Sequence, residues 1–448
     1  MKLKLAALVA LFTINTACRA ESNWPQFRGP RASGVSDEPA PVTWNVETGE
    51  NVRWQTPIPG LGHACPIVWN DRIYIATAVK PGDKPKLKVG LYGDVGSYAE
   101  NESHQWRLIC LDKATGKILW DKLEFEGVPH SKRHTKATQC NSTPATDGQR
   151  IVAMFGSEGL FCFDMDGKLL WRKDLGKLDA AWYVDTSTSW GFGSSPVLYD
   201  GKVLLQCDVL SQQFIAAYDA KDGHEVWRTA RKDVPTWSTP LVAESGGKLQ
   251  VVASGYKEMA GYDLASGKEL WRVNEGGGDI PVASPILARD LVILTSGHGR
   301  YRPFRAINLA TASGDITPPK IEATNSAVVW SHPRNGDYLA TPIAVGDLVW
   351  GDLDGIVTCF DVKTGQIYYN ERIGGGAEGF TASSVSAGGK LYYTGEQGDV
   401  FVLPATKEFS VLATNSLGGL CLSTPAISDG TIYFRTTEKL VAVGNKPK

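Results

Sequence analysis

The stretch Asp112-Lys-Ala-Thr-Gly-Lys-Ile-Leu-Trp120 decides the fold, because its order of aspartate, glycine and aromatic residue returns along the chain. With Asp112, Gly116 and Trp120 as the first copy, the others are Asp164, Gly167 and Trp171; Asp219, Gly223 and Trp227; Asp263, Gly267 and Trp271; and Asp361, Gly365 and Tyr369. We expect the glycine to take the positive φ of a hairpin turn and the aspartate to accept hydrogen bonds from the turn amides. We expect the tryptophan to pack one sheet on the next.

A second element, a small residue followed by proline, marks eight starts. They are Cys65-Pro66, Thr143-Pro144, Ser195-Pro196, Thr239-Pro240, Ser284-Pro285, Thr341-Pro342, Ser383-Ser384 (without proline) and Thr424-Pro425. The shortest spacings run from 41 residues (384 to 425) to 45 (240 to 285), which matches the roughly 40–45 residues of a four-stranded propeller blade. The sequence therefore predicts an all-β, eight-bladed β-propeller of four-stranded antiparallel blades.

The ring closure can also be predicted. Blade 8 would start at Pro425 and has room for about three strands before Lys448. Asn51-Val-Arg-Trp54 has the pattern of an outermost strand and precedes the first start, so we expect it to complete blade 8 and remove an exposed edge. This divides the chain into a signal peptide (1–20), an N-terminal extension (21–50) and the propeller (51–448).

Two blades depart from the repeat. In blade 5, Asn308 stands in place of the aspartate, and an insertion from Asn308 to Ala327 precedes Trp330. We expect this insertion to be flexible. Blade 7 ends near Phe409 without a tryptophan.

The N-terminus predicts export to the periplasm or cell envelope. Lys2 and Lys4 precede an apolar stretch, and small residues up to Ala20 suit cleavage after that position. A lipid anchor on Cys18 is the alternative, but Asn15 stands where lipoproteins usually carry leucine. No later apolar run is long enough to cross a bilayer. The formal net charge of −2 argues against nucleic acid as the main partner.

With these repeats, the chain resembles the pyrroloquinoline-quinone-like repeat propellers, related in fold to the quinoprotein alcohol dehydrogenases. The resemblance also rests on Trp24-Pro-Gln-Phe-Arg-Gly-Pro30 and Pro59-Gly-Leu-Gly-His63. It implies an eight-bladed propeller. It leaves function open, since the family includes enzymes and a non-catalytic subunit of the outer-membrane β-barrel assembly machinery.

The catalytic relatives carry adjacent cysteines that form a vicinal disulfide over the quinone, and this chain has no adjacent pair. We therefore expect no cofactor, with pyrroloquinoline quinone and calcium as the alternative. Cys110, Cys162 and Cys359 each lie two residues before a repeat aspartate and are interpreted as packing residues. Bridges among Cys65, Cys140, Cys207 and Cys421 stay open.

Other motifs have structural interpretations. Gly374–Gly379 is a glycine-rich connection between blades, because neither a helix nor an ATP-site strand follows it. Asp352-Leu-Asp-Gly355 and Asp164-Met-Asp-Gly167 are turns without the terminal glutamate of a calcium loop. His130 and His134 lie in a loop with Lys132, Arg133 and Lys136, which predicts a solvated basic surface rather than a metal site.

The longest loops all belong to connections on one face of a propeller. They run from Val79 to Gln105, Asp121 to Gln139, Arg172 to Gly193 and His298 to Arg305. Long loops on one side mark a functional face. The predicted partner-binding residues in them are of types enriched in binding hot spots: Trp182, Tyr183, Trp190, Arg300, Tyr301 and Arg302.

The sequence thus predicts an exported, monomeric, non-catalytic scaffold that binds a protein or polymer in the cell envelope. The alternatives are a quinone- or metal-dependent oxidoreductase and a sensor of a small ligand in the ring mouth. Loops that only pack on themselves remain the simplest competing interpretation.

Overall fold

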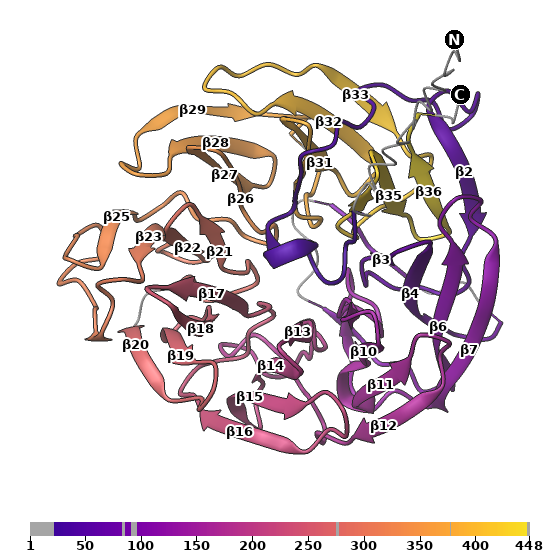
Figure 1. Ribbon diagram of the computed structural model, residues 1–448, viewed down its shortest axis with the longest axis horizontal. Coiled ribbons are helices and arrows are strands. Elements are labelled where there is room, and N and C mark those ends of the chain that lie inside the picture. Colours follow the sequence, from indigo (N-terminus) through magenta and orange to yellow (C-terminus); the bar gives the residue numbers. More distant parts are fainter. Residues whose placement is uncertain (1–21, 83–85, 91–95, 275–276, 377, 446–448) are drawn as a thin grey trace, which may run out of the picture.

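Eight four-stranded antiparallel sheets surround a central axis in the computed structural model (Figure 1). The structure describes residues 22–82, 86–90, 96–274, 277–376 and 378–445. The predicted signal peptide lies outside these residues. The all-β eight-bladed propeller predicted from the repeats is confirmed.

The strands of each blade are given from the axis outward. Blade 1 contains β3 (Ile67–Trp69), β4 (Arg72–Val79), β6 (His104–Asp112) and β7 (Ile118–Gly127), and blade 2 contains β9 (Ala145–Thr146), β10 (Arg150–Met154), β11 (Leu160–Asp164) and β12 (Leu169–Lys173). Blade 3 contains β13 (Val197–Tyr199), β14 (Lys202–Asp208), β15 (Gln213–Asp219) and β16 (Glu225–Ala230), and blade 4 contains β17 (Leu241–Ser245), β18 (Lys248–Ala253), β19 (Glu258–Asp263) and β20 (Glu269–Asn274). Blade 5 contains β21 (Ile286–Ala288), β22 (Leu291–Thr295), β23 (Phe304–Asn308) and β25 (Val328–His332), and blade 6 contains β26 (Ile343–Val345), β27 (Leu348–Leu353), β28 (Ile356–Asp361) and β29 (Ile367–Arg372). Blade 7 contains β30 (Val385–Ala387), β31 (Lys390–Thr394), β32 (Asp399–Pro404) and β33 (Ala413–Ser416), and blade 8 contains β34 (Ala426–Ser428), β35 (Thr431–Arg435), β36 (Lys439–Val443) and β2 (Val52–Pro57). The remaining short elements are β1 (Val35–Ser36), β5 (Ser97–Tyr98), β8 (Arg133–His134), β24 (Gly314–Asp315) and the 3₁₀ turns η1 (Pro30–Ala32) and η2 (Gly156–Glu158).

The N-terminal strand closes the ring as expected. β2 pairs antiparallel with β36, with Trp54 opposite Ala442. Blade 8 therefore takes three strands from the C-terminal end and its outermost strand from residues 52–57. Figure 1 shows indigo β2 beside yellow β36 at this junction.

The repeat tryptophan of one blade contacts the turn glycine of the next, and this contact joins neighbouring blades on the outside of the ring. The Trp227 indole Nε1 in blade 3 donates to the carbonyl of Leu264 in blade 4 at 3.0 Å. Gly267 in the same turn has φ +70, and a Cβ on it would lie 2.4 Å from the Trp227 ring. Two residues after the tryptophan, the Thr229 hydroxyl donates to the Gly267 carbonyl at 2.6 Å. Three other indoles donate in the same way to the backbone carbonyl of the residue that follows a repeat aspartate. The pairs are Trp54 with Lys113, Trp171 with Ala220, and Trp330 with Val362.

Two repeat tryptophans do not donate in this way. Trp120 packs over Gly167, but its buried indole Nε1 has no hydrogen-bond partner among the described residues. For Trp271 the reason lies in blade 5. Blade 5 lacks the aspartate-glycine turn, and the Trp271 indole instead donates to Gln250 of its own blade at 2.7 Å, packed over Gly261. The insertion expected to be flexible is held in place here. Its strand β24 pairs in parallel with β20, and Ile316 is buried against blades 4 and 5. The insertion thus covers the outer edge of blade 4, which the expectation of flexibility did not foresee.

A belt of hydrogen bonds joins the blades near the axis. We define the belt as the residue that starts each blade: Cys65, Thr143, Ser195, Thr239, Ser284, Thr341, Ser383 and Thr424. Each amide donates to the hydroxyl of the next member, from Cys65 through Ser383, in seven bonds of 2.9–3.1 Å. The eighth position carries the Cys65 thiol. Burial raises its pKa, and hydrogen bonds from Thr143, Ser423 and Thr424 oppose that rise.

The proline after each belt residue fits the inner edge of a blade, where an amide would have no strand to pair with. Blade 7 has Ser384 in place of proline, and it is the blade whose inner edge receives an additional strand. β1 pairs in parallel with β30 there, and the Ser386 amide donates to the Gly34 carbonyl at 2.8 Å.

The N-terminal extension crosses the axis as a strap, defined as residues 22–50 (Figure 1, indigo around η1). The backbone of Trp24 forms an antiparallel β-bridge with Val68 in blade 1. On the far side, buried Arg28 donates to the carbonyls of Pro342 and Ser384, each at 2.8 Å. The strap therefore ties opposite sides of the ring together.

Removing the strap and β2 should weaken the whole ring. A chain that starts at residue 58 leaves β36 as an open edge. It also lacks Arg28, so the carbonyls of Pro342 and Ser384 lose this donor. We expect a lower melting temperature and a broader unfolding transition by calorimetry than for a chain starting at residue 22. Identical transitions in the two chains would contradict the closure.

Replacing the turn glycine tests the outer contact. Gly267→Ala forces a Cβ into the Trp227 ring, and it should cost about as much as Trp227→Ala, roughly 3–5 kcal/mol in the free energy of unfolding. Gly246→Ala is the matched control, because Gly246 also has positive φ but has open space around its Cβ position. The control should cost only about 1–2 kcal/mol of backbone strain in denaturant titration. Equal costs for the two glycines would show that the contact with tryptophan does not matter.

Candidate functional site

A cavity of about 740 Å³ lies on the ring axis. All belt residues line it, and Phe27 of the strap contributes to its lining. Its other walls come from the connections between blades and from loops of blades 5 and 6, such as those carrying Arg302 and Asp354. These segments belong to one face of the propeller, which we call the loop face.

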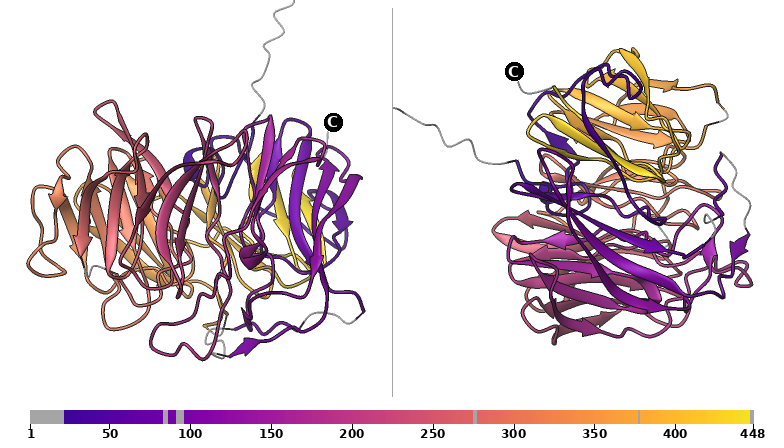
Figure 2. Two further views of the ribbon diagram at one scale, coloured as in Figure 1. Left: turned by 90° about the horizontal axis from the view of Figure 1, so that it is seen from below. Right: turned by 90° about the vertical axis from the view of Figure 1, so that its right-hand side faces the viewer.

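The predicted asymmetry of the two faces is confirmed. The connections between blades and the loops between second and third strands extend well beyond one side of the disc (Figure 2, left). The turns of the other face are short, apart from the blade 5 insertion and the connection between β32 and β33. One predicted boundary was wrong, since β7 continues to Gly127 and the loop expected from Asp121 begins only after it.

The segment expected to be a solvated basic surface is buried in part, because His130 and Lys132 are exposed whereas Arg133 and Lys136 are buried. Lys136 lines the cavity and pairs with Glu396 at 2.9 Å, with 10% and 0% of the two side chains exposed. Arg133 is 1% exposed and makes two bonds to Glu100. The prediction failed because both cations have carboxylate partners from distant loops that spacing along the chain does not reveal.

Three further charged groups surround the cavity near Lys136. Asp354 lies at the tight turn between β27 and β28, where burial raises its pKa while Lys136, Arg372 and Arg302 oppose that rise. Arg372 donates to the backbone carbonyl of Asp354 at 3.0 Å. Arg302 Nε is buried without a hydrogen-bond partner. Among the described residues, neither guanidinium forms an ion pair with a carboxylate.

Aromatic rings form another part of the wall. Trp182 meets His298 edge to face at 5.7 Å between centroids, and His298 packs on Tyr338 at 5.6 Å. Trp190 and Trp237 lie 5.6 Å apart at 34°. These rings are tilted or perpendicular to one another, so they do not form a flat slot.

The six predicted partner-binding residues divide into two groups. Trp182, Trp190 and Arg302 line the cavity. Tyr183 stacks on Tyr256 outside it, and the exposed Arg300 and Tyr301 contact each other. Trp190 is only 8% exposed and packs on Trp237 and His134, so this position supports the self-packing interpretation of the loops. Partner binding by the other five stays a prediction.

Sequence reasoning missed several cavity residues, namely Lys136, Asp354, Arg372, Trp237 and Tyr338. Trp237 and Tyr338 each lie two or three residues before a belt residue, at the end of a connection between blades. An aromatic residue at that position could have been predicted from the sequence to lie near the axis. Asp354 was hidden inside a turn that was interpreted, correctly, as structural.

The remaining motifs are placed as follows. Asp164–Gly167 and Asp352–Gly355 are hairpin turns, as predicted. Gly374–Gly379 connects blades 6 and 7. His130 pairs with Glu158 and His134 packs on Trp190, and the two belong to different contacts. All seven cysteines among the described residues are free thiols and buried.

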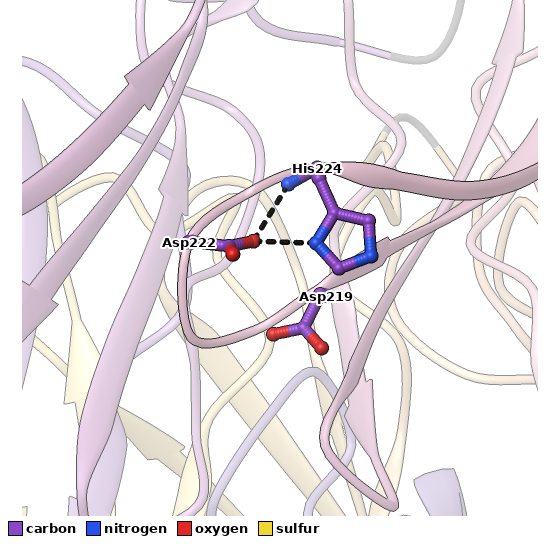
Figure 3. A group of neighbouring side chains, drawn as sticks. All are labelled: Asp219, Asp222 and His224. Atoms are coloured by element: carbon purple, nitrogen blue, oxygen red, sulfur yellow. Dashed lines mark hydrogen bonds and ion pairs between the residues drawn. The ribbon is translucent and has the colours of Figure 1, made fainter.

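One group of the described residues has the spacing of a metal site. Asp219, Asp222 and His224 lie together in the hairpin turn between β15 and β16 (Figure 3). His224 Nδ1 lies 2.7 Å from Asp222, and both are exposed on the face opposite the cavity. Asp219 is a repeat aspartate whose carboxylate accepts from a turn amide. The group is therefore accounted for by the turn.

The cavity residues do not fit a calcium-held quinone. Glu396 is already engaged by Lys136, by the Thr381 hydroxyl and by the Gly90 amide. Asp354 is the one carboxylate among the described lining residues. Cys65 is the one lining cysteine described, so no adjacent pair covers a flat ligand there.

Among the described residues, no helix is long and apolar enough to cross a membrane.

Comparison with known proteins agrees with the propeller. The sequence has no significant match among curated proteins. BamB from Moraxella catarrhalis is similar over 82% of this chain and 100% of its own, with 14% identity and a TM-score of 0.54. Quinohemoprotein alcohol dehydrogenase from Comamonas testosteroni matches 95% of this chain and 81% of its own, with 11% identity and a TM-score of 0.61. The alcohol dehydrogenase ADHIIG from Pseudomonas putida HK5 has the same coverage, with 12% identity and a TM-score of 0.56.

At these identities the solved structures establish a shared fold only. The family model described as outer membrane protein assembly factor BamB matches residues 104–371, more than half of the chain. The chain therefore belongs to this family of pyrroloquinoline-quinone-like repeat propellers.

Proposed function

We propose that the protein is an exported, non-catalytic propeller that binds a protein partner in the cell envelope through its loop face. The observation that carries this proposal is the difference between the two faces. Long loops, one of which exposes Arg300 and Tyr301, gather on one side, whereas the other side carries the strap and mostly short turns (Figure 2). A family described as an assembly factor of the outer membrane supports a scaffold role.

The exposed part of the loop face supplies suitable contacts. Val184 is 61% exposed and Tyr301 is 41% exposed, while the Arg300 guanidinium lies over the Tyr301 ring, 5.2 Å from its centroid. An arginine beside an aromatic ring is typical of the few residues that dominate a protein interface. Neither side chain is needed for the packing of a blade, so both are available to a partner.

The oxidoreductase alternative has less support. The described cavity residues lack both the adjacent cysteines and a free set of carboxylates for calcium, as argued above. The small-ligand alternative is favoured by a specific observation, the axial cavity of about 740 Å³.

Substitutions on the two faces test the partner surface. Arg300→Ala and Tyr301→Ala should leave the melting temperature unchanged, because both side chains are exposed. They should weaken capture of envelope proteins by the immobilised propeller, since truncating a hot spot costs about 2 kcal/mol or more of binding free energy. Lys117→Ala and Lys268→Ala, in turns of the opposite face, are the matched controls and should change neither property.

The result that contradicts the proposal is the reverse pattern. If the opposite-face changes abolish capture and the loop-face changes leave it intact, the functional face has been assigned wrongly.

A further inference from the structure

We propose that the axial cavity binds a short acidic saccharide, with its carboxylate held by Arg302 and Arg372 and its ring faces against the aromatic wall. This goes beyond the proposed function, because it assigns a small ligand to the interior of the ring rather than a partner to its rim.

The two arginines point to an anionic group. Two other polar side chains at the cavity have carboxylate partners within the protein: Lys136 pairs with Glu396 at 2.9 Å, and His298 Nδ1 lies 2.6 Å from Asp279. Arg302 and Arg372 have no such partner among the described carboxylates, and a buried Nε of Arg302 has no hydrogen bond. A carboxylate is the group that a guanidinium binds with paired hydrogen bonds.

Asp354 shows that the ligand must also donate hydrogen bonds. Its carboxyl lies among Lys136, Arg372 and Arg302 at the cavity wall, and a ligand made only of carboxylates would meet repulsion there. Hydroxyl groups both donate and accept. A ligand that offers hydroxyls to Asp354 and a carboxylate to the arginines satisfies both signs of charge.

The rest of the cavity suits sugar rings. Seven belt hydroxyls line it, and each already accepts an amide. Those of Thr143 and Thr424 also contact the Cys65 thiol, whereas the five from Ser195 to Ser383 keep an O–H available to donate. Trp182 and Tyr338 add apolar faces on which the C–H side of a pyranose can pack. Because these rings are tilted against their neighbours, a puckered sugar fits better than a flat aromatic ligand. The volume of about 740 Å³ lies within the range of about 300–1,000 Å³ typical of small-molecule sites.

Calorimetric titration with defined probes tests the inference. The probes are trimers of galacturonate, mannuronate and guluronate, together with the methyl ester of each, which keeps the rings and removes the charge. We expect at least one free acid to bind with one-to-one stoichiometry and its ester to bind about tenfold or more weakly. Arg302→Gln and Arg372→Gln should each weaken binding of the acid by about tenfold, and should leave the already weaker binding of the ester nearly unchanged.

Arg289→Gln is the matched control, because Arg289 is exposed and pairs with Asp347 on the opposite face. It should not change binding. Arg372 is exposed, so Arg372→Gln should fold normally even if the change at Arg302 disturbs its loop.

Three outcomes overturn the inference: no probe binds, acid and ester bind equally, or Arg372→Gln binds like the wild type. One-to-one binding of pyrroloquinoline quinone with calcium that displaces the acid would also overturn it in favour of a cofactor site. None of these outcomes affects capture through Arg300 and Tyr301, so failure here is distinct from failure of the proposed function.

Discussion

Seven of the eight blades begin at a residue whose amide donates to the hydroxyl of the corresponding residue in the next blade, and the rest of the molecule depends on this belt. Seven such bonds follow one another from Cys65 to Thr424. Buried amides are costly to leave unpaired, so the belt fixes how closely the innermost strands approach the axis. That spacing leaves the cavity open, and the belt hydroxyls become part of its wall. Blade 7 lacks the proline after its belt residue, and its inner edge receives the additional strand β1.

The outer side of the ring is held by a different contact. Tryptophan indoles donate to the turn of the following blade and pack against a glycine that has no room for a Cβ, as Trp227 does with Gly267. Inner and outer contacts together align each sheet with the next, and β2 extends the same arrangement across the gap between the chain ends, with Trp54 donating to Lys113. Since the frame is supplied by repeated residues, the loops above it are free to differ and to carry binding groups.

The frame could be predicted from the sequence because its residues recur at a fixed spacing. The roles of Asp112, Gly116 and Trp120 could be predicted because the same residue types recur in other blades. The closure could be predicted because Asn51–Trp54 resembles the outermost strand of the repeat. The cavity could not be predicted in the same way. Lys136 meets Glu396 across 260 positions of sequence, and Asp354 lies in a turn whose pattern is entirely structural. Non-repeating residues that converge on an axis leave no periodic signal, and Arg133 and Lys136 were therefore mistaken for a solvated surface.

Hydrogen exchange at the belt amides tests the central claim most directly. If the belt closes the ring as one cooperative unit, the amides of Thr143, Ser195, Thr239, Ser284, Thr341 and Ser383 should exchange only through global unfolding. Their opening free energies, measured by NMR or by mass spectrometry of short peptides, should then be equal to one another and to the free energy of unfolding. Opening free energies that differ from blade to blade, or that fall well below the global value, would contradict the account.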